Sequence, residues 1–169
     1  WKAASAVDSS AENVAALIGA DRDEIVFTSG ATEANNLALL GFGRGNYEGN
    51  RRRVLVGSTE HKCVLEAART LGTQNGFVVE EIPVDQNGLV DLNFLRDSMA
   101  EDVLLVSVGA VNSEIGTVQP IEMVADIVHE QGAVFHCDAA QAPLEYSTQK
   151  YGDFVDLLSL SAHKFYGPK

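Results

Sequence analysis

Lys164, Asp138 and the turn at residues 29–32 carry the side chains of this sequence that are best suited to catalysis. Lys164 follows an apolar run at 157–160 almost directly and precedes the stiff turn at 166–168. A lysine amine that is desolvated or lies near other cations becomes a nucleophile and can form a Schiff base. Taken alone, Lys164 is equally well explained as a surface lysine after a strand.

Asp138 ends a short run of mainly apolar residues that begins at Ala133. A buried carboxylate is costly unless a cation or hydrogen-bond donors pair with it. A protonated pyridine nitrogen is such a cation, and a carboxylate at that nitrogen keeps the ring an effective electron sink. Asp138 is therefore a candidate partner for a pyridine cofactor.

The turn at 29–32, with sequence SGAT, precedes an apolar-periodic helix and follows a β-rich run. The free N–H groups and the dipole of a helix's first turn bind anions, and a hydroxyl adds a donor. The alternative is that Thr32 is only an N-cap, with Glu33 favourable in the first turn. Neither a Rossmann fingerprint nor a P-loop pattern occurs in the sequence.

Two other groups are open to a catalytic and a structural interpretation. His61 stands at an expected helix start, where a histidine is more often structural than catalytic. Cys63, Cys137 and the histidines lack the ligand spacing of a zinc site, so we expect no metal. A helix-start anion site, a strand-end aspartate and a later strand-end lysine follow one another in the order used by pyridoxal-phosphate sites.

Short β-rich runs alternate with amphipathic stretches along the chain. The pattern predicts an α/β fold with a mainly parallel sheet flanked by helices. We expect strands at 24–28, 54–56, 78–82, 103–108, 133–137 and 157–160. We expect helices at 3–18, 32–40, 64–71, 92–99 and 120–128, with an exposed glycine-rich loop at 41–49.

The polar groups that follow these strands should share one edge of the sheet. Ligands of open α/β sheets bind at the carboxyl ends of the strands. We therefore expect five strand ends to converge there, namely those followed by residues 29–32, 60–62, 112–113, 138–141 and 161–164.

Composition restricts the classes of partner. The chain has 169 residues, enough for one domain, and a formal net charge of −12. This charge disfavours nucleic acid and anionic membrane surfaces, which bind clustered positive charge. The basic run at 51–53 is expected to be a solvated turn before a strand, and no run approaches the ~20 apolar residues of a membrane helix. Two cysteines make no disulfide framework, so we expect a reducing compartment.

Five motifs resemble, in order and spacing, those of the cysteine desulfurases of the class V aminotransferase superfamily. They are FTSGATEANN at 27–36, TEHK at 59–62, VNSEIG at 111–116, DAAQ at 138–141 and SAHKFYGPK at 161–169. The motifs at 59–62 and 161–169 resemble the iron–sulfur-cluster and nitrogen-fixation group. The resemblance covers essentially the whole chain and implies a partial large domain of a fold-type I transferase that depends on pyridoxal 5′-phosphate.

The resemblance also implies roles for individual residues. Lys164 would form the Schiff base and move protons, and His61 would stack on the ring and assist protonation. Asp138 would pair with the ring nitrogen. Gln141 and Asn112 would lie at the ring oxygen, with Asn112 also near the substrate carboxylate. The phosphate contacts implied are Ala31, Thr32, Ser161 and His163.

The implied reaction converts L-cysteine to L-alanine and passes sulfur to an enzyme thiol for iron–sulfur cluster or thio-cofactor assembly. Residues 1–169 are then expected to form an incomplete large domain, without the N-terminal segment, the C-terminal small domain or the persulfide cysteine. We expect a homodimer, a sulfur acceptor or iron–sulfur scaffold protein as partner, and a cytoplasmic location, or the mitochondrial matrix in a eukaryote. Ser113 stands where the family usually has asparagine.

Two alternatives stay open at this point. One is a selenocysteine lyase or another class V lyase or aminotransferase. The other is a catalytically inactive truncated fragment.

Overall fold

A five-stranded parallel sheet forms the centre of the fold. The computed structural model describes residues 2–145 and 148–168. The strand order is β2-β1-β3-β4-β5, and every neighbouring pair is parallel. The strands are β1 (Arg53–Gly57), β2 (Val78–Ile82), β3 (Val103–Ser107), β4 (Val134–Asp138) and β5 (Leu157–Ser159). The α/β prediction and the positions of these strands are confirmed.

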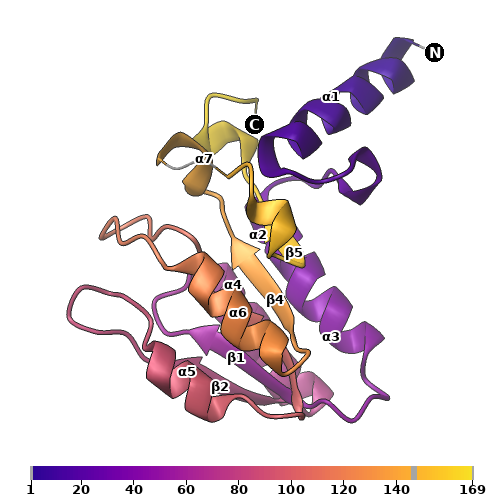
Figure 1. The fold of residues 1–169 in the computed structure, drawn as a ribbon. Helices are drawn as coiled ribbons and strands as arrows, with labels where there is room; N and C mark the ends of the chain where they lie inside the picture. The colour runs from indigo at the N-terminus through magenta and orange to yellow at the C-terminus, as the bar shows by residue number, and fades with distance from the viewer. Residues whose placement is uncertain (1, 146–147, 169) are drawn as a thin grey trace.

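Helices cover both faces of the sheet (Figure 1). On one face lie α5 (Leu92–Ser98) and α6 (Ile121–Glu130), and on the other lie α3 (Phe42–Gly45) and α4 (Lys62–Asn75). The remaining elements are α1 (Lys2–Ile18), η1 (Arg22–Glu24), α2 (Ala31–Asn36), the π-helical η2 (Leu37–Gly41), α7 (Ala142–Glu145), η3 (Tyr151–Asp153) and η4 (Ala162–Lys164). Helix α7 was not predicted.

The sheet separates two apolar cores, one for each layer of helices. Leu55, Val106 and Phe135 pack with residues of α5 and α6. Val54, Val56 and Leu105 pack with residues of α4 and η2. All five residues of β3 are buried, as expected for the central strand of a sheet covered on both faces. The burial of both faces holds the strands in one register, and this aligns their carboxyl ends.

The prediction of a strand at 24–28 is wrong. Residues 22–24 form the 3₁₀ turn η1, and residues 25–28 belong to no strand. Val26 is 67% exposed and Phe27 54% exposed, so these β-formers are not part of the core. Consequently four strand ends, together with the start of α2, meet where five strand ends were expected. Helix α1 extends away from the sheet in Figure 1.

The exposed loop expected at 41–49 is also partly wrong. A continuous helical segment runs from α2 through η2 into α3 and ends at Gly45. Gly43 is buried, and a Cβ at this position would lie 2.7 Å from Leu71 Cδ2. The glycine allows close packing of α3 on α4, whereas the sequence pattern suggested an exposed loop.

The basic run at 51–53 leads into β1, whose first residue is Arg53, and it is not simply solvated. Arg53 pairs with Glu80 at 2.8 Å and with Asp102 at 3.2 Å. Arg52 lies over the ring of Tyr47, 4.4 Å from its centroid. The arginines therefore anchor the start of β1.

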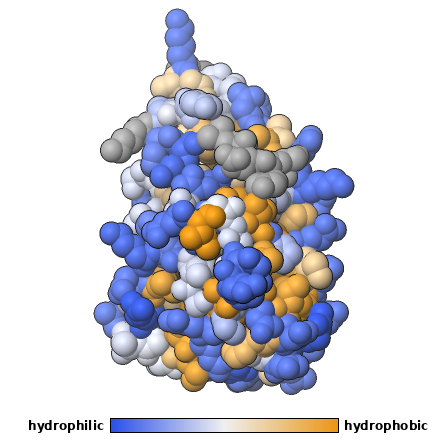
Figure 2. All heavy atoms as spheres, turned by 90° about the vertical axis from the view of Figure 1, so that its left-hand side faces the viewer, coloured by the Kyte–Doolittle hydropathy of each residue, from blue (hydrophilic) through white to orange (hydrophobic). Residues whose placement is uncertain are grey.

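The molecular surface is mainly hydrophilic on the side shown in Figure 2, with hydrophobic atoms near the middle of the view. This agrees with the excess of acidic residues. Within residues 2–145 and 148–168, no helix has the length and apolar content of a membrane span.

Candidate active site

A cavity of about 890 Å³ lies where the strands end. It is lined by loops that follow β1, β3, β4 and β5 and by the start of α2. Every site residue predicted from the sequence lines it, namely Ala31, Thr32, His61, Asn112, Asp138, Gln141, Ser161, His163 and Lys164. The parallel sheet brings together positions that are more than a hundred residues apart in the chain.

The start of α2 presents backbone donors to the cavity. Gly30 precedes the helix with φ 147°, a conformation that favours glycine. The first intrahelical bond, from Ala34 N–H to Gly30 O, leaves the N–H groups of residues 31–33 outside the helical ladder. The Glu33 carboxylate turns back and accepts the Ser29 N–H at 2.6 Å, and the Ser29 hydroxyl and N–H lower the pKa of Glu33.

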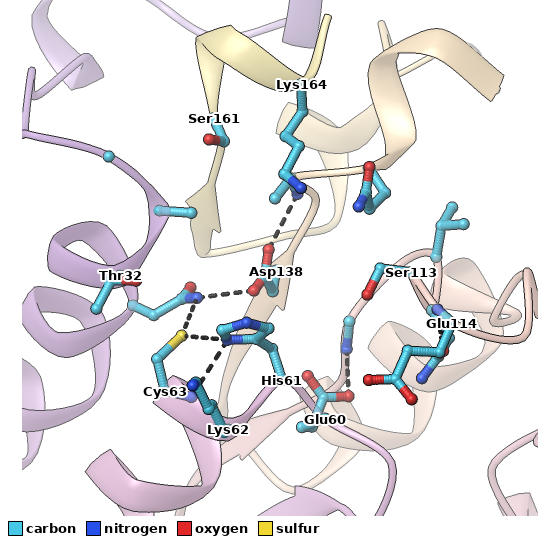
Figure 3. Close-up of a pocket in the computed structure, with 18 of the residues that line it drawn as sticks. Thr32, Glu60, His61, Lys62, Cys63, Ser113, Glu114, Asp138, Ser161 and Lys164 are labelled. Atoms are coloured by element: carbon cyan, nitrogen blue, oxygen red, sulfur yellow. Dashed lines mark hydrogen bonds between the residues drawn. The ribbon is translucent and has the colours of Figure 1, made fainter. Parts of the chain in front are cut away.

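Asp138 is held by two donors from different parts of the chain. Its Oδ2 accepts from Asn35 Nδ2 at 2.7 Å, and its Oδ1 accepts from Ala140 N–H at 3.0 Å. Asp138 borders the cavity (Figure 3). Its carboxylate has more lone pairs than these two hydrogen bonds use. A carboxylate with these donors is fixed in orientation and able to accept from a cationic N–H.

Asn35 was not predicted as a site residue. It is completely buried, and its Nδ2 also lies 3.3 Å from Cys63 Sγ. Within the part of the chain that the structure describes, Asn35 Oδ1 has no hydrogen-bond partner. Its position one helical turn after Thr32 is the sequence signal that could have identified it, because residues three apart share a helix face.

His61 is the N-cap of α4. Its Nδ1 accepts the Cys63 N–H at 3.2 Å and lies 2.9 Å from Cys63 Sγ. Accepting a backbone proton at Nδ1 leaves the proton of the neutral ring on Nε2. The imidazole is exposed to the cavity, and Figure 3 shows His61 on the side opposite Lys164, with Asp138 between them.

Glu60 is a second carboxylate in the cavity wall that the sequence analysis left without a role. Its Oε1 accepts the Gly109 N–H at 2.7 Å. Glu60 lines the cavity. Desolvation raises its pKa to about 8, the charge of Asp138 adds to this increase, and the hydrogen bond from Gly109 opposes it. Its position directly before His61 was the available signal.

The side-chain amide of Asn112 already forms hydrogen bonds with backbone groups of the protein. Its Nδ2 donates to Thr59 O at 2.9 Å, and its Oδ1 accepts the N–H groups of Glu114 and Ile115. The side chain therefore joins the loop after β3 to the loop after β1. One amide proton of Nδ2 is left for another acceptor.

The loop after β5 carries the remaining predicted residues. The Ser161 hydroxyl lies 3.1 Å from His163 Nδ1, and Lys164 ends η4 (Figure 3). Lys62 also lines the cavity, whereas Lys169 lies outside the described residues.

A buried histidine lies in the strands beneath the site. His136 Nδ1 is 2.8 Å from Ser107 Oγ, and its Nε2 is 3.1 Å from Ser159 Oγ. Burial lowers the pKa of His136 to about 4, so the ring is neutral and links β3, β4 and β5. Cys137 is completely buried, which raises its thiol pKa well above the usual value. The described residues contain no cluster of metal ligands.

Comparison with known proteins gives a consistent result. The family model described as "Aminotransferase class-V" matches residues 1–169. "Cysteine desulfurase, mitosomal" of Encephalitozoon cuniculi is 47% identical over 170 residues, covering 100% of this chain and 39% of that protein. "Cysteine desulfurase IscS" of Ehrlichia chaffeensis is 48% identical over 168 residues, covering 99% of this chain and 40% of that protein.

Solved structures with the same fold include "SspA in complex with cysteine", with a TM-score of 0.92 and 37% identity. The match covers 99% of this chain and 48% of that one. A "NIFS-LIKE PROTEIN" matches with a TM-score of 0.90 and 38% identity over 96% of this chain and 45% of that one. The chain thus spans less than half the length of these relatives.

Proposed function

Because this chain belongs to the class-V aminotransferase family, we propose that it is the cofactor-binding part of a cysteine desulfurase. The reaction proposed for the intact protein takes L-cysteine, releases L-alanine and transfers the sulfur atom to an enzyme thiol as a persulfide. The curated relatives reported above are cysteine desulfurases, and this supports desulfuration over the selenocysteine lyase alternative.

The cavity fits pyridoxal 5′-phosphate, the cofactor of this family. Its volume of about 890 Å³ lies in the range of small-molecule sites, roughly 300–1,000 Å³. The donor set also matches, because an amine (Lys164), a carboxylate with free lone pairs (Asp138) and the free N–H groups at the start of α2 open into one space. That convergence is the observation that carries the proposal.

Different residues of the cavity would bind different parts of the cofactor. Asp138 would bind the ring nitrogen, Lys164 would attach to the aldehyde carbon, and Gln141 and Asn112 would bind the ring oxygen. The phosphate would be bound at the start of α2 by Ala31 and Thr32, and by Ser161 and His163 after β5. When bound, the cofactor supplies an electron sink for the substrate's α-carbon.

The chain's own groups would hold and move the protons. Asp138, fixed by Asn35 and Ala140, keeps a negative charge where the ring nitrogen carries its proton. Lys164 Nζ would accept and return the proton of the substrate α-carbon. His61 accepts the Cys63 N–H at Nδ1, so Nε2 would be the ring nitrogen available for proton transfer. The side chain of Asn112 would orient the substrate carboxylate.

The intact protein is further proposed to be a homodimer that delivers sulfur to an acceptor or iron–sulfur scaffold protein. Relatives of bacterial and mitochondrial origin are consistent with the cytoplasm or the mitochondrial matrix as its location. Sedimentation that finds a fully active monomer would contradict the dimer.

Reductive labelling tests the central assignment. Treating the intact protein and its cofactor with borohydride, followed by peptide mapping, should place the label on Lys164. Lys62→Arg is the matched control, since Lys62 lines the same cavity, and this variant should label normally. Label on Lys62 or Lys169, or no label in a folded sample, would refute the assignment.

A further inference from the structure

We infer that Glu60 lies in the cavity wall as a neutral carboxylic acid at neutral pH, and that its ionisation at alkaline pH weakens anion binding in the site. The inference extends the proposed function, because it assigns a pH-dependent role in cofactor binding to a residue with no role so far.

Two glycines define the position of the Glu60 carboxyl group. A Cβ on Gly57 would lie 2.8 Å from Oε1, and a Cβ on Gly109 would lie 3.0 Å from Oε2. The carboxyl group therefore fills the space that both missing side chains leave at the ends of β1 and β3. A hydrogen bond from Glu60 N–H to Gly57 O, at 3.2 Å, fixes the backbone of Glu60 in a turn. The group cannot move far without leaving this space.

Glu60 has few partners that would stabilise a negative charge. It accepts one backbone N–H, that of Gly109, and forms no ion pair among the residues that the structure describes. Asp138, in contrast, accepts from both Asn35 and Ala140. Of two carboxyl groups in one cavity wall, the better-solvated or better-bonded one ionises first and disfavours ionisation of the other. Two donors are therefore available to a negative charge on Asp138 and one to a negative charge on Glu60, and this difference favours the protonated form of Glu60.

The pKa of Glu60, about 8, agrees with this division and is raised mainly by desolvation. Other titratable groups face the same cavity from every surrounding element. They are Glu33 of α2, His61, Lys62 and Cys63 at the start of α4, Glu114 after β3, Asp138 of β4, and His163 and Lys164 of η4. The buried thiol of Cys137 also interacts with Glu60. A test must separate Glu60 from these groups.

The neutral acid differs from the carboxylate in what it offers a ligand. A protonated carboxyl group has one O–H donor, whereas the ionised group only accepts. Within residues 2–145 and 148–168, no protein donor reaches Oε2. At neutral pH Glu60 can donate to an acceptor oxygen of a bound anion. Above pH ~8 it instead adds a negative charge to the site.

Infrared spectroscopy detects the proton directly in the cofactor-free intact protein. Wild type should show a protonated carboxylic-acid carbonyl band at pH 7 that disappears with a midpoint near pH 8. The isosteric variant Glu60→Gln should lack this band. Absence of the band in wild type at pH 7, or its persistence in Glu60→Gln, would overturn the inference.

Binding of pyridoxine 5′-phosphate measures the consequence. This probe has the phosphate and the ring oxygen but lacks the aldehyde, so it cannot react with Lys164. Between pH 7 and pH 9.5, the affinity of wild type should fall about tenfold more than that of Glu60→Gln, the order expected for one added charge in a partly desolvated site. Glu114→Gln is the matched control, because it removes an exposed carboxylate from the same cavity and should keep the wild-type pH dependence.

The outcomes separate this inference from the proposed function. Equal pH dependence in wild type and Glu60→Gln would overturn the inference while leaving cofactor binding intact. Failure of every variant to bind the probe would refute the proposed function, and the infrared titration would still decide the protonation state of Glu60.

Discussion

Replacing His136 with glutamine should make the stability of the protein less sensitive to acid. His136 is completely buried and bonded at both ring nitrogens, to Ser107 Oγ and Ser159 Oγ. Burial lowers its pKa to about 4, whereas an unfolded histidine titrates near ~6.5. Glutamine has an amide oxygen and an NH₂ group, so it can bond to both serines without titrating.

The magnitude follows from the two pKa values. Between pH ~6.5 and pH ~4 the unfolded state binds a proton at this position that the folded state does not, so stability falls as the pH falls. Lowering the pH from 7 to 5 should cost wild type about 2 kcal/mol through this residue alone. The stability that neutral His136 contributes is fully present above the pKa of this residue in the unfolded state. It is lost as the pH falls toward the pKa of His136 in the folded state.

Urea unfolding of the intact protein at pH 7 and pH 5 provides the assay. The free energy of unfolding of His136→Gln should fall by about 2 kcal/mol less than that of wild type over this range. His129→Gln, which changes an exposed histidine paired with Asp156, should not reduce the loss in acid. An equal loss in wild type and His136→Gln would refute the reasoning.

Three further changes have expected outcomes. Asp138→Asn should lower turnover of the intact protein by ~100-fold or more, since it removes the charge proposed to pair with the ring nitrogen, and unchanged steady-state rates would show that Asp138 is misassigned. Gly43→Ala should destabilise by about 1–3 kcal/mol in urea, because its Cβ meets Leu71, whereas Gly45→Ala, with open space around its Cβ, should not. Asn35→Ala should weaken cofactor binding about tenfold or more in absorbance titrations by releasing Asp138; unaltered affinity would contradict this.

The strands of the sheet were well predicted because the pattern of apolar residues along the sequence reflects which side chains are buried. The run at 103–108 is apolar except for Ser107, and all five residues of β3 are buried. Residues 25–28 show where that reasoning fails, since β-propensity describes a side chain on a pleated surface and does not supply a neighbouring strand. Val26 and Phe27 have no such neighbour among the described residues and stay exposed.

The glycines at 41–49 were misinterpreted for a related reason. A glycine in sequence signals a turn or a close approach equally well. Gly43 serves the second purpose, because the helix α3 passes Leu71 at short range. Only the packing of two helices distinguishes these cases, and local sequence does not contain it.

The predicted site residues do converge on one cavity, because ligands of parallel sheets bind at the carboxyl ends of the strands. Their roles stay predictions. The contacts of Asn35 and Glu60 were not predictable, since each depends on a partner far away in the chain, Asp138 and Gly109 respectively. The His136 network likewise joins residues of three strands. No local pattern encodes such pairs.

The strand order also determines when the site can be completed during synthesis. The ribosome produces β1, β3 and β4 first, so the wall containing Glu60, His61 and Asp138 can assemble early. Among the described strands, β5 has three residues, pairs with β4 and follows the other four in the chain, shortly before Lys164. A nascent chain therefore contains the start of α2 and the carboxylates of the cavity before it contains Lys164, and the proposed attachment of the cofactor to that amine must wait until β5 has emerged.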